Sequence, residues 1–209
     1  MPVGDSHLAF AEAAGRDGIE LDTRADFDWL TELGHLTLED FAAEPTATAD
    51  PEALHTAAEA LGEMYGVLGG DPSVLESCRA NLFIPVDLVH QPTGTIIEID
   101  EAHHFTSFRL KTLDRYPASA EVGFDLEAYR ELCREKASEY DKFARGQAAK
   151  GFGFGGVQRE RAYRDALRDL GAPAMGLPPV VRFVALDGDG AAAYARHRES
   201  LVELLGVTR

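Results

Sequence analysis

The chain has 209 residues, of which 45% are hydrophobic and 27% charged, and its formal net charge at pH 7 is −16. This length predicts one large domain or a small domain with additions. The sequence contains no run of about 18 apolar residues, so no membrane span is expected. The start, MPVGDSHLAF, lacks the pattern of a secretory signal. Only Cys78 and Cys133 occur, without a CxxC motif. We therefore expect a cytoplasmic protein without disulfides.

The negative charge is concentrated in the first part of the chain. Residues 1–80 hold 17 Asp/Glu and 3 Lys/Arg, whereas residues 81–209 hold 19 and 17. Such an acidic part repels nucleic acid over about a Debye length. It serves either as a device for solubility or as a surface for a basic protein partner, a second copy of the chain or autoinhibition.

The first 80 residues carry helical patterns. Asp50 followed by Pro51 is a typical helix start, and Gly69-Gly70 is a typical stop. Helices are expected over 5–15, in one or two pieces within 19–38, over 51–67 and over 72–80, with a loop at 42–50. We expect residues 1–72 to form an acidic helical extension packed on a core made by residues 73–209.

The stretch from Ile84 to Phe105 predicts two short strands joined by a turn at Pro92-Thr93-Gly94. Alternate side chains of a strand point to opposite faces, so Glu98 and Asp100 share a face with Ile96. Asp87 lies on the preceding strand. Three carboxylates on a half-buried sheet are costly unless they are compensated, and a Mg or Mn ion would compensate them. The alternative is a solvated hairpin face.

The residues after the hairpin are expected to supply positive charge, a helix and a glycine-rich loop. Arg109, Lys111 and Arg115 bring positive charge near the acids, and a charged helix is expected over about 125–148. We treat 118–150 as a helical insertion into the core. The glycine-rich run between Lys150 and Val157 lacks the P-loop pattern, which favours a flexible loop over a phosphate cradle.

The helix expected over 157–170 is the most basic of the chain. Tyr163, Ala166, Leu167 and Leu170 form its apolar stripe, and Gln158, Arg161, Asp165 and Arg168 line another face. Arginine suits phosphate through paired hydrogen bonds, although a salt-bridged exposed face has the same pattern. Gly171 is expected to end this helix. A buried strand over 180–186, with Arg182 as its one polar residue, and a helix over 191–205 complete the chain.

This order of elements resembles the PD-(D/E)XK nuclease superfamily, and most of all the branch of the very-short-patch repair endonuclease. The resemblance covers about half of the chain and depends on Asp87, IIEIDEAHH (96–104), Gln158, YRDALRDLG (163–171) and VVRF (180–183). It implies an α/β fold with a restriction-endonuclease-like core, a small mixed sheet flanked by helices.

The resemblance also implies roles for individual residues. Asp87 and Glu98 would be metal ligands, joined by Asp100, which occupies the place of the usual superfamily lysine. His103 or His104 would take over the role of that lysine, and Arg109 or Lys111 would supply positive charge. The implied activity is Mg- or Mn-dependent hydrolysis of phosphodiester bonds, with histidine as acid or base. Gln158, Arg161 and Arg182 would orient the phosphate or stabilise transition-state charge.

Two other classes of function stay open. A zinc hydrolase would use His90, Glu98, His103 and His104, although no usual zinc-hydrolase spacing such as HExxH is present. A catalytically inactive nuclease fold would instead act as an interaction protein through its acidic surface. The expected partner is nucleic acid, DNA before RNA, with strandedness left open. The low aromatic share, without basic–aromatic interleaving, argues against a plain single-strand binding platform.

Overall fold

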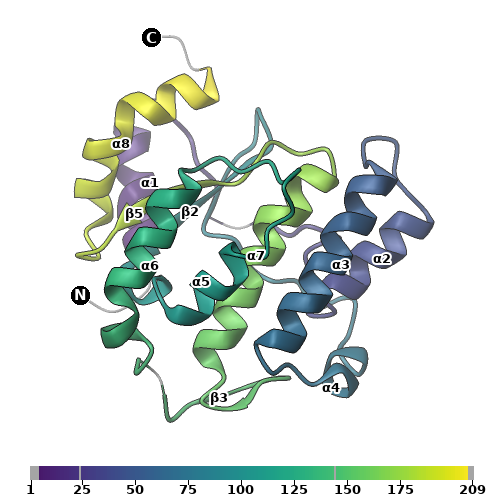
Figure 1. Ribbon diagram of the computed structural model, residues 1–209. Coiled ribbons are helices and arrows are strands. Elements are labelled where there is room, and N and C mark those ends of the chain that lie inside the picture. The colour runs from purple at the N-terminus through teal and green to yellow at the C-terminus, as the bar shows by residue number, and fades with distance from the viewer. Residues whose placement is uncertain (1–4, 24, 144, 207–209) are drawn as a thin grey trace.

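The computed structural model describes residues 5–23, 25–143 and 145–206. Within these ranges the chain is a mixed α/β fold, in which eight α-helices surround a small three-stranded sheet (Figure 1). The mixed α/β class and the small mixed sheet flanked by helices are as the sequence predicts. None of the helices in the described ranges has the length and hydrophobicity needed to cross a membrane.

The sheet has the strand order β1-β2-β5. β1 (Leu88–His90) and β2 (Thr95–Glu101) form the predicted antiparallel hairpin, and β5 (Val181–Ala185) pairs with β2 in parallel. The turn of the hairpin is closed by the Gly94 amide, which donates to the His90 carbonyl, and Gly94 adopts the positive φ that favours glycine. In this register Glu98 lies opposite Arg182, so β2 carries acids beside a strand with one buried base.

Most of the expected helices are present with altered bounds, and a further helix over 107–113 was not expected. A short 3₁₀ helix, η1 (Ala102–His104), follows β2 directly. The α-helices are α1 (Ser6–Arg16), α2 (His35–Ala43), α3 (Pro51–Val67), α4 (Pro72–Glu76), α5 (Ser107–Leu113), α6 (Leu126–Tyr140), α7 (Val157–Ala174) and α8 (Gly190–Leu205). The start of α3 is confirmed in detail, because the Asp50 carboxylate accepts the amides of Glu52 and Ala53.

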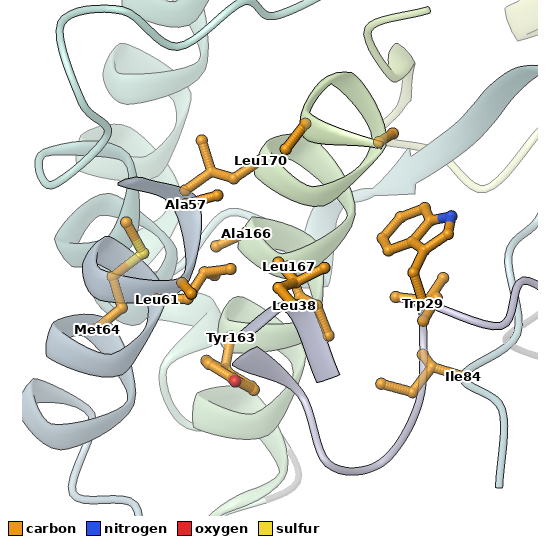
Figure 2. Close-up of a cluster of buried hydrophobic side chains, with 14 of the residues drawn as sticks. Trp29, Leu38, Ala57, Leu61, Met64, Ile84, Tyr163, Ala166, Leu167 and Leu170 are labelled. Carbon is orange, nitrogen blue, oxygen red and sulfur yellow. The ribbon is translucent and has the colours of Figure 1, made fainter. Parts of the chain in front are cut away.

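Two hydrophobic clusters pack against the sheet. The larger one joins α2 and α3 to α7, and Figure 2 shows Leu61 of α3 pointing toward Leu167 of α7. The smaller one places α1 and α8 against Ile97, Ile99 and Phe183. Burying one such side chain contributes about 1.5–3 kcal/mol. The helices of the first 72 residues therefore pack into both clusters.

Four local predictions differ from the structure. Gly171 lies inside α7 instead of ending it, and Trp29 packs so closely there that a Cβ would lie 2.5 Å from its ring, so the position has room only for glycine. The described residues between Ile19 and Gly34 form turns rather than a helix. The glycine-rich run is not a plain loop: β4 (Gly153–Phe154) pairs with β3 (Ala148–Ala149) in a short hairpin, the β3–β4 hairpin. In addition, α6 ends at Tyr140, short of the expected 148.

Candidate functional site

The side chains of β2 divide between its faces as predicted. Ile97 and Ile99 enter the cluster under α1 and α8, whereas Ile96 joins the cluster with α7. Glu98 and Asp100 lie on the same face as Ile96, and both are almost completely buried, with 3% and 1% exposure. This burial excludes a solvated hairpin face, because an uncompensated charge at these positions would cost several kcal/mol.

Arg182 of β5 compensates the charge of Asp100. Its Nη1 lies 3.0 Å from both carboxylate oxygens of Asp100, and its Nε donates to Asp169 at 2.8 Å. Burial opposes the guanidinium charge, but Asp100, Asp169 and Asp165 raise the pKa of Arg182 well above its usual range. Arg182 thus joins two strands to α7 through charged hydrogen bonds.

Arg109 compensates the second oxygen of Asp169. Its Nη2 donates to Asp169 Oδ2 at 2.6 Å, and its Nη1 donates to the hydroxyl of Tyr116 at 2.8 Å. The same hydroxyl donates to Asp169. Arg109 is 2% exposed, so it holds a buried carboxylate and does not face solvent. Of the other two cations expected near the acids, Lys111 is exposed with its ammonium over the ring of Phe108, and Arg115 pairs with Glu63.

His104 lies between two carboxylates. Its Nδ1 is 3.2 Å from Asp100 Oδ1 and 3.2 Å from Asp165 Oδ2. Burial lowers the pKa of His104, but Asp165 and Asp100 outweigh that effect and raise it above its usual value. His104 is therefore the histidine that faces the acids, and the two carboxylates favour its charged form.

Asp87 and Glu98 form an adjacent pair of carboxylates. The Asp87 amide donates to Glu98 Oε1 at 3.2 Å, and Asp87 Oδ2 accepts the Ile99 amide at 2.8 Å. Arg168 of α7 has its Nε 3.4 Å from Glu98 Oε1, without a hydrogen bond. Burial, partly opposed by Arg168, raises the pKa of Glu98 to about 8. Glu98 is thus the buried acid whose ionisation is least compensated by the protein.

His103, Gln158 and Arg161 form the rim of this region. The His103 ring stacks on Phe143, and burial together with His104 and Arg161 lowers the pKa of His103 to about 3. Gln158 donates to the carbonyl oxygens of His103 and Tyr140, and its own amide oxygen accepts from Arg161 at 2.7 Å. His103, which is neutral, and Arg161, which is half-buried, therefore lie beside His104, whose charged form is favoured.

The expected metal ligands differ in their fit to a cation. Within residues 5–23, 25–143 and 145–206, no group of three or more His, Cys, Asp or Glu side chains is arranged to hold a metal ion. Asp100 is engaged by Arg182, His104 and the Tyr129 hydroxyl, which leaves the set of three carboxylates incomplete. Asp87 and Glu98 do fit, because Mg²⁺ is commonly held by one or two carboxylates with water and phosphate completing its shell.

The zinc alternative gains no support from the geometry. His90, one of its four residues, bonds to Thr93 in the turn of the hairpin, at the other end of β2 from His103 and His104. The described part of the chain contains no histidine-rich cluster suited to zinc.

Several residues of the network could not be assigned from the sequence. Asp169 and Tyr129 bond to predicted residues that lie 13–60 positions away in the sequence, and Tyr116 bonds to Arg109, seven positions away. Asp165 and Arg168 were visible as part of one helix face with Gln158 and Arg161. The sequence contains one signal for these acids: an arginine in a buried strand needs carboxylates nearby to compensate its charge.

Comparison with known proteins adds one match. Residues 63–150 match the model of a family of unknown function, DUF7255, which covers fewer than half of the residues. The match includes Asp87, Glu98, Asp100, His103, His104 and Arg109, but ends before α7 and β5. No curated protein and no solved structure matches the chain.

Removing the guanidinium of Arg182 should destabilise the fold strongly. In Arg182→Met, Asp100 and Asp169 lose their buried partner, and the free energy of unfolding should fall by about 3–5 kcal/mol. Urea denaturation followed by circular dichroism measures this change. Arg134→Met, which removes an exposed pair with Glu127 on α6, should leave the melting temperature near that of the wild type. Equal effects of the two substitutions would contradict the network.

The acid Glu98 should make stability fall as pH rises. Its folded pKa of about 8 exceeds the ordinary value of 4.5, so the folded state holds a proton that the unfolded state releases between these values. Glu98→Gln should therefore gain stability relative to the wild type from pH 4.5 to 8, by up to about 1.4 kcal/mol per pH unit. Urea titrations at pH 5, 6.5 and 8 test this, with the exposed Glu203→Gln as control. A difference that does not change with pH would refute the assignment.

Proposed function

We propose that the protein is a metal-dependent nuclease that hydrolyses phosphodiester bonds, with Asp87 and Glu98 as the ligands of a Mg²⁺ or Mn²⁺ ion. The observation that carries the proposal is the pairing of these two carboxylates beside a network that holds fixed positive charge. Such an arrangement suits a reaction in which negative charge develops on phosphate oxygens. The proposed nuclease core is the α/β unit formed by the three-stranded sheet and α7.

The donor chemistry of the pair supports a hard divalent cation. Both side chains offer oxygen atoms only, and Glu98 is 3% exposed, so its ionised form gains from a nearby positive charge. The bound ion would supply Lewis-acid polarisation of the phosphate and a water of lowered pKa. Asp100 has a different role in this proposal, because its oxygens already bond to Arg182 and Tyr129. It positions His104.

His104 is the proposed proton donor to the leaving oxygen. Asp100 and Asp165 both contact its Nδ1, which orients the ring and favours the charged form. The other ring nitrogen, Nε2, then carries the proton that the leaving group takes up. His103 is neutral at physiological pH because its pKa is about 3, which makes it too weak a base to take a proton from water, so its role in this proposal is to stack or to accept a hydrogen bond.

Arg161 is the proposed anchor for the substrate phosphate. Its guanidinium contacts the neutral amide oxygen of Gln158, and in the described residues no carboxylate lies within 4 Å of it. Gln158 holds Arg161 in turn, because its amide nitrogen bonds to two backbone carbonyls. Arg109 and Arg182 stabilise carboxylates rather than substrate, and Lys111 lies over Phe108.

A second candidate is an inactive nuclease fold that acts as an interaction protein. The observation that favours it is that Asp100, Asp165 and Asp169 are all neutralised by the protein's own arginines and His104. A network of this kind stabilises a fold whether or not a substrate binds. The acidic surface of residues 1–80 would then dock a basic protein or a second copy of the chain.

Nicking of supercoiled plasmid in Mg²⁺ or Mn²⁺ tests the nuclease proposal. Wild type should nick, Glu98→Gln and Asp87→Asn should be reduced to background, and His104→Gln should lose about 10²–10⁴-fold in rate. Glu203→Gln is the matched control on the exposed face of α8 and should nick as the wild type does. Melting curves of all variants establish that they are folded.

The two candidates predict opposite results in this assay. Cleavage that disappears with either Asp87 or Glu98 supports the nuclease. Failure of the folded wild type to cleave plasmid DNA, single-stranded DNA and RNA in either metal would contradict the nuclease and favour the interaction protein.

A further inference from the structure

A basic segment runs through an otherwise acidic protein. Residues 142–164 hold six Lys/Arg and one Glu, within a chain whose net charge is −16. The segment comprises the chain after α6, the β3–β4 hairpin and the first two turns of α7. All three lie at the same end of the molecule, as Figure 1 shows. We call it the basic hairpin segment.

Two phenylalanines of this segment face solvent. Phe154, in β4, is 78% exposed and is the most exposed large hydrophobic side chain among the described residues. Phe143 is 37% exposed on one side and stacks on His103 on the other, with ring centroids 5.1 Å apart. An exposed aromatic ring forgoes the stabilisation that burial would give, so a ring this exposed, opposite Ala148 in the hairpin, points to a binding role.

The hairpin holds Phe154 in place through its backbone. Arg159 donates to the carbonyl oxygens of Phe152 and Phe154, at 2.6 and 3.2 Å. The ring of Phe152 is buried against Tyr65 and Tyr163, which anchors the hairpin to the core. The exposed ring is therefore presented by a fixed support, which lowers the entropic cost of binding.

Two of the cations in this segment are exposed and open to a partner, and two others have no acidic partner in the described part of the chain. Lys142 and Arg145 are exposed, and Arg159 and Arg161 contact neutral oxygens. Among the residues that the structure describes, no carboxylate lies within 4 Å of any of these four cations. In contrast, Lys150 and Arg164 are paired with Glu32 and Glu160. The unpaired cations match the charge of a polyphosphate chain.

We propose that the basic hairpin segment binds single-stranded nucleic acid, with Phe154 stacking on a base and Lys142 and Arg145 contacting phosphates. The flat faces of bases are accessible to a side chain only where the strand is unstacked, which favours a single strand over a regular duplex. Phe143, in contact with His103, would continue the path of the strand toward the histidines. This inference names the substrate class of the nuclease and rests on the proposed function.

This local arrangement differs from what the whole composition indicates. The aromatic share of 9% argues against a binding platform that spans the chain. The basic hairpin segment instead brings together two exposed rings and four cations that have no carboxylate within 4 Å among the described residues. Because the rest of the surface repels phosphate, this segment is where a strand meets the least repulsion.

Fluorescence anisotropy in EDTA tests the inference without cleavage. The probes are a labelled single-stranded oligonucleotide and its duplex, compared with each other at the same salt concentration and then titrated over a series of salt concentrations. Phe154→Ala should weaken single-strand binding about 5- to 100-fold, and Phe154→Trp should retain it, because stacking and not size is required. Arg145→Ala should make affinity less dependent on salt, reducing the magnitude of the slope of log affinity against log salt by about 0.7. Leu204→Ala, at an exposed leucine of α8, is the control.

The outcomes separate this inference from the nuclease proposal. Equal affinity of wild type and Phe154→Ala, or tighter binding of the duplex than of the single strand, would overturn the inference even if plasmid nicking is observed. Loss of single-strand binding in Phe154→Ala would support it even if no nucleic acid is ever cleaved. No affinity of the wild type for either probe would overturn it and leave a protein as the partner of this segment.

Discussion

The contact of Arg182 with Asp100 and Asp169 is the interaction on which the other features of the site depend. Arg182 is fully buried in the central layer, where its charge is tolerated only because the carboxylates surround it. The contact sets the distance of α7 from the sheet, since Asp169 belongs to that helix and Asp100 to β2. It also fixes Asp100 beside His104. A single charged side chain thus positions the helix, the strand and the histidine.

One buried acid, Glu98, has fewer positively charged partners than the other buried acids. Asp100, Asp165 and Asp169 each contact at least one arginine or His104 through a hydrogen bond or an ion pair, whereas Glu98 has only Arg168 at 3.4 Å. This difference explains why the pKa of Glu98 is raised and that of Asp165 is lowered, although both side chains are buried. It also indicates where an additional positive charge would be most stabilising, namely between Glu98 and its neighbour Asp87.

The sequence was informative where local chemistry decides the structure. Asp50 and Pro51 predicted the start of α3, and alternation along β2 predicted which side chains share a face with Glu98. It was uninformative where distant residues decide. Gly171 is typical of a helix end, but it lies inside α7, where the ring of the distant Trp29 leaves no room for a Cβ. Asp100 looked like a metal ligand, but a strand that follows 80 residues later neutralises it. The spacing of residues in the sequence does not reveal a partner that comes from a distant strand, as Arg182 does.

Calorimetric titration of Mg²⁺ at pH 7, in buffers of different ionisation enthalpy, tests the central claim most directly. If Glu98 is protonated in the free protein and the cation binds between it and Asp87, binding must release about 0.9 proton, in line with a pKa of about 8. The observed enthalpy should therefore change with the buffer at pH 7 but not at pH 9.5, and Glu98→Gln should show no such dependence. No heat of Mg²⁺ binding in the wild type, or binding at pH 7 without proton release, would contradict the account.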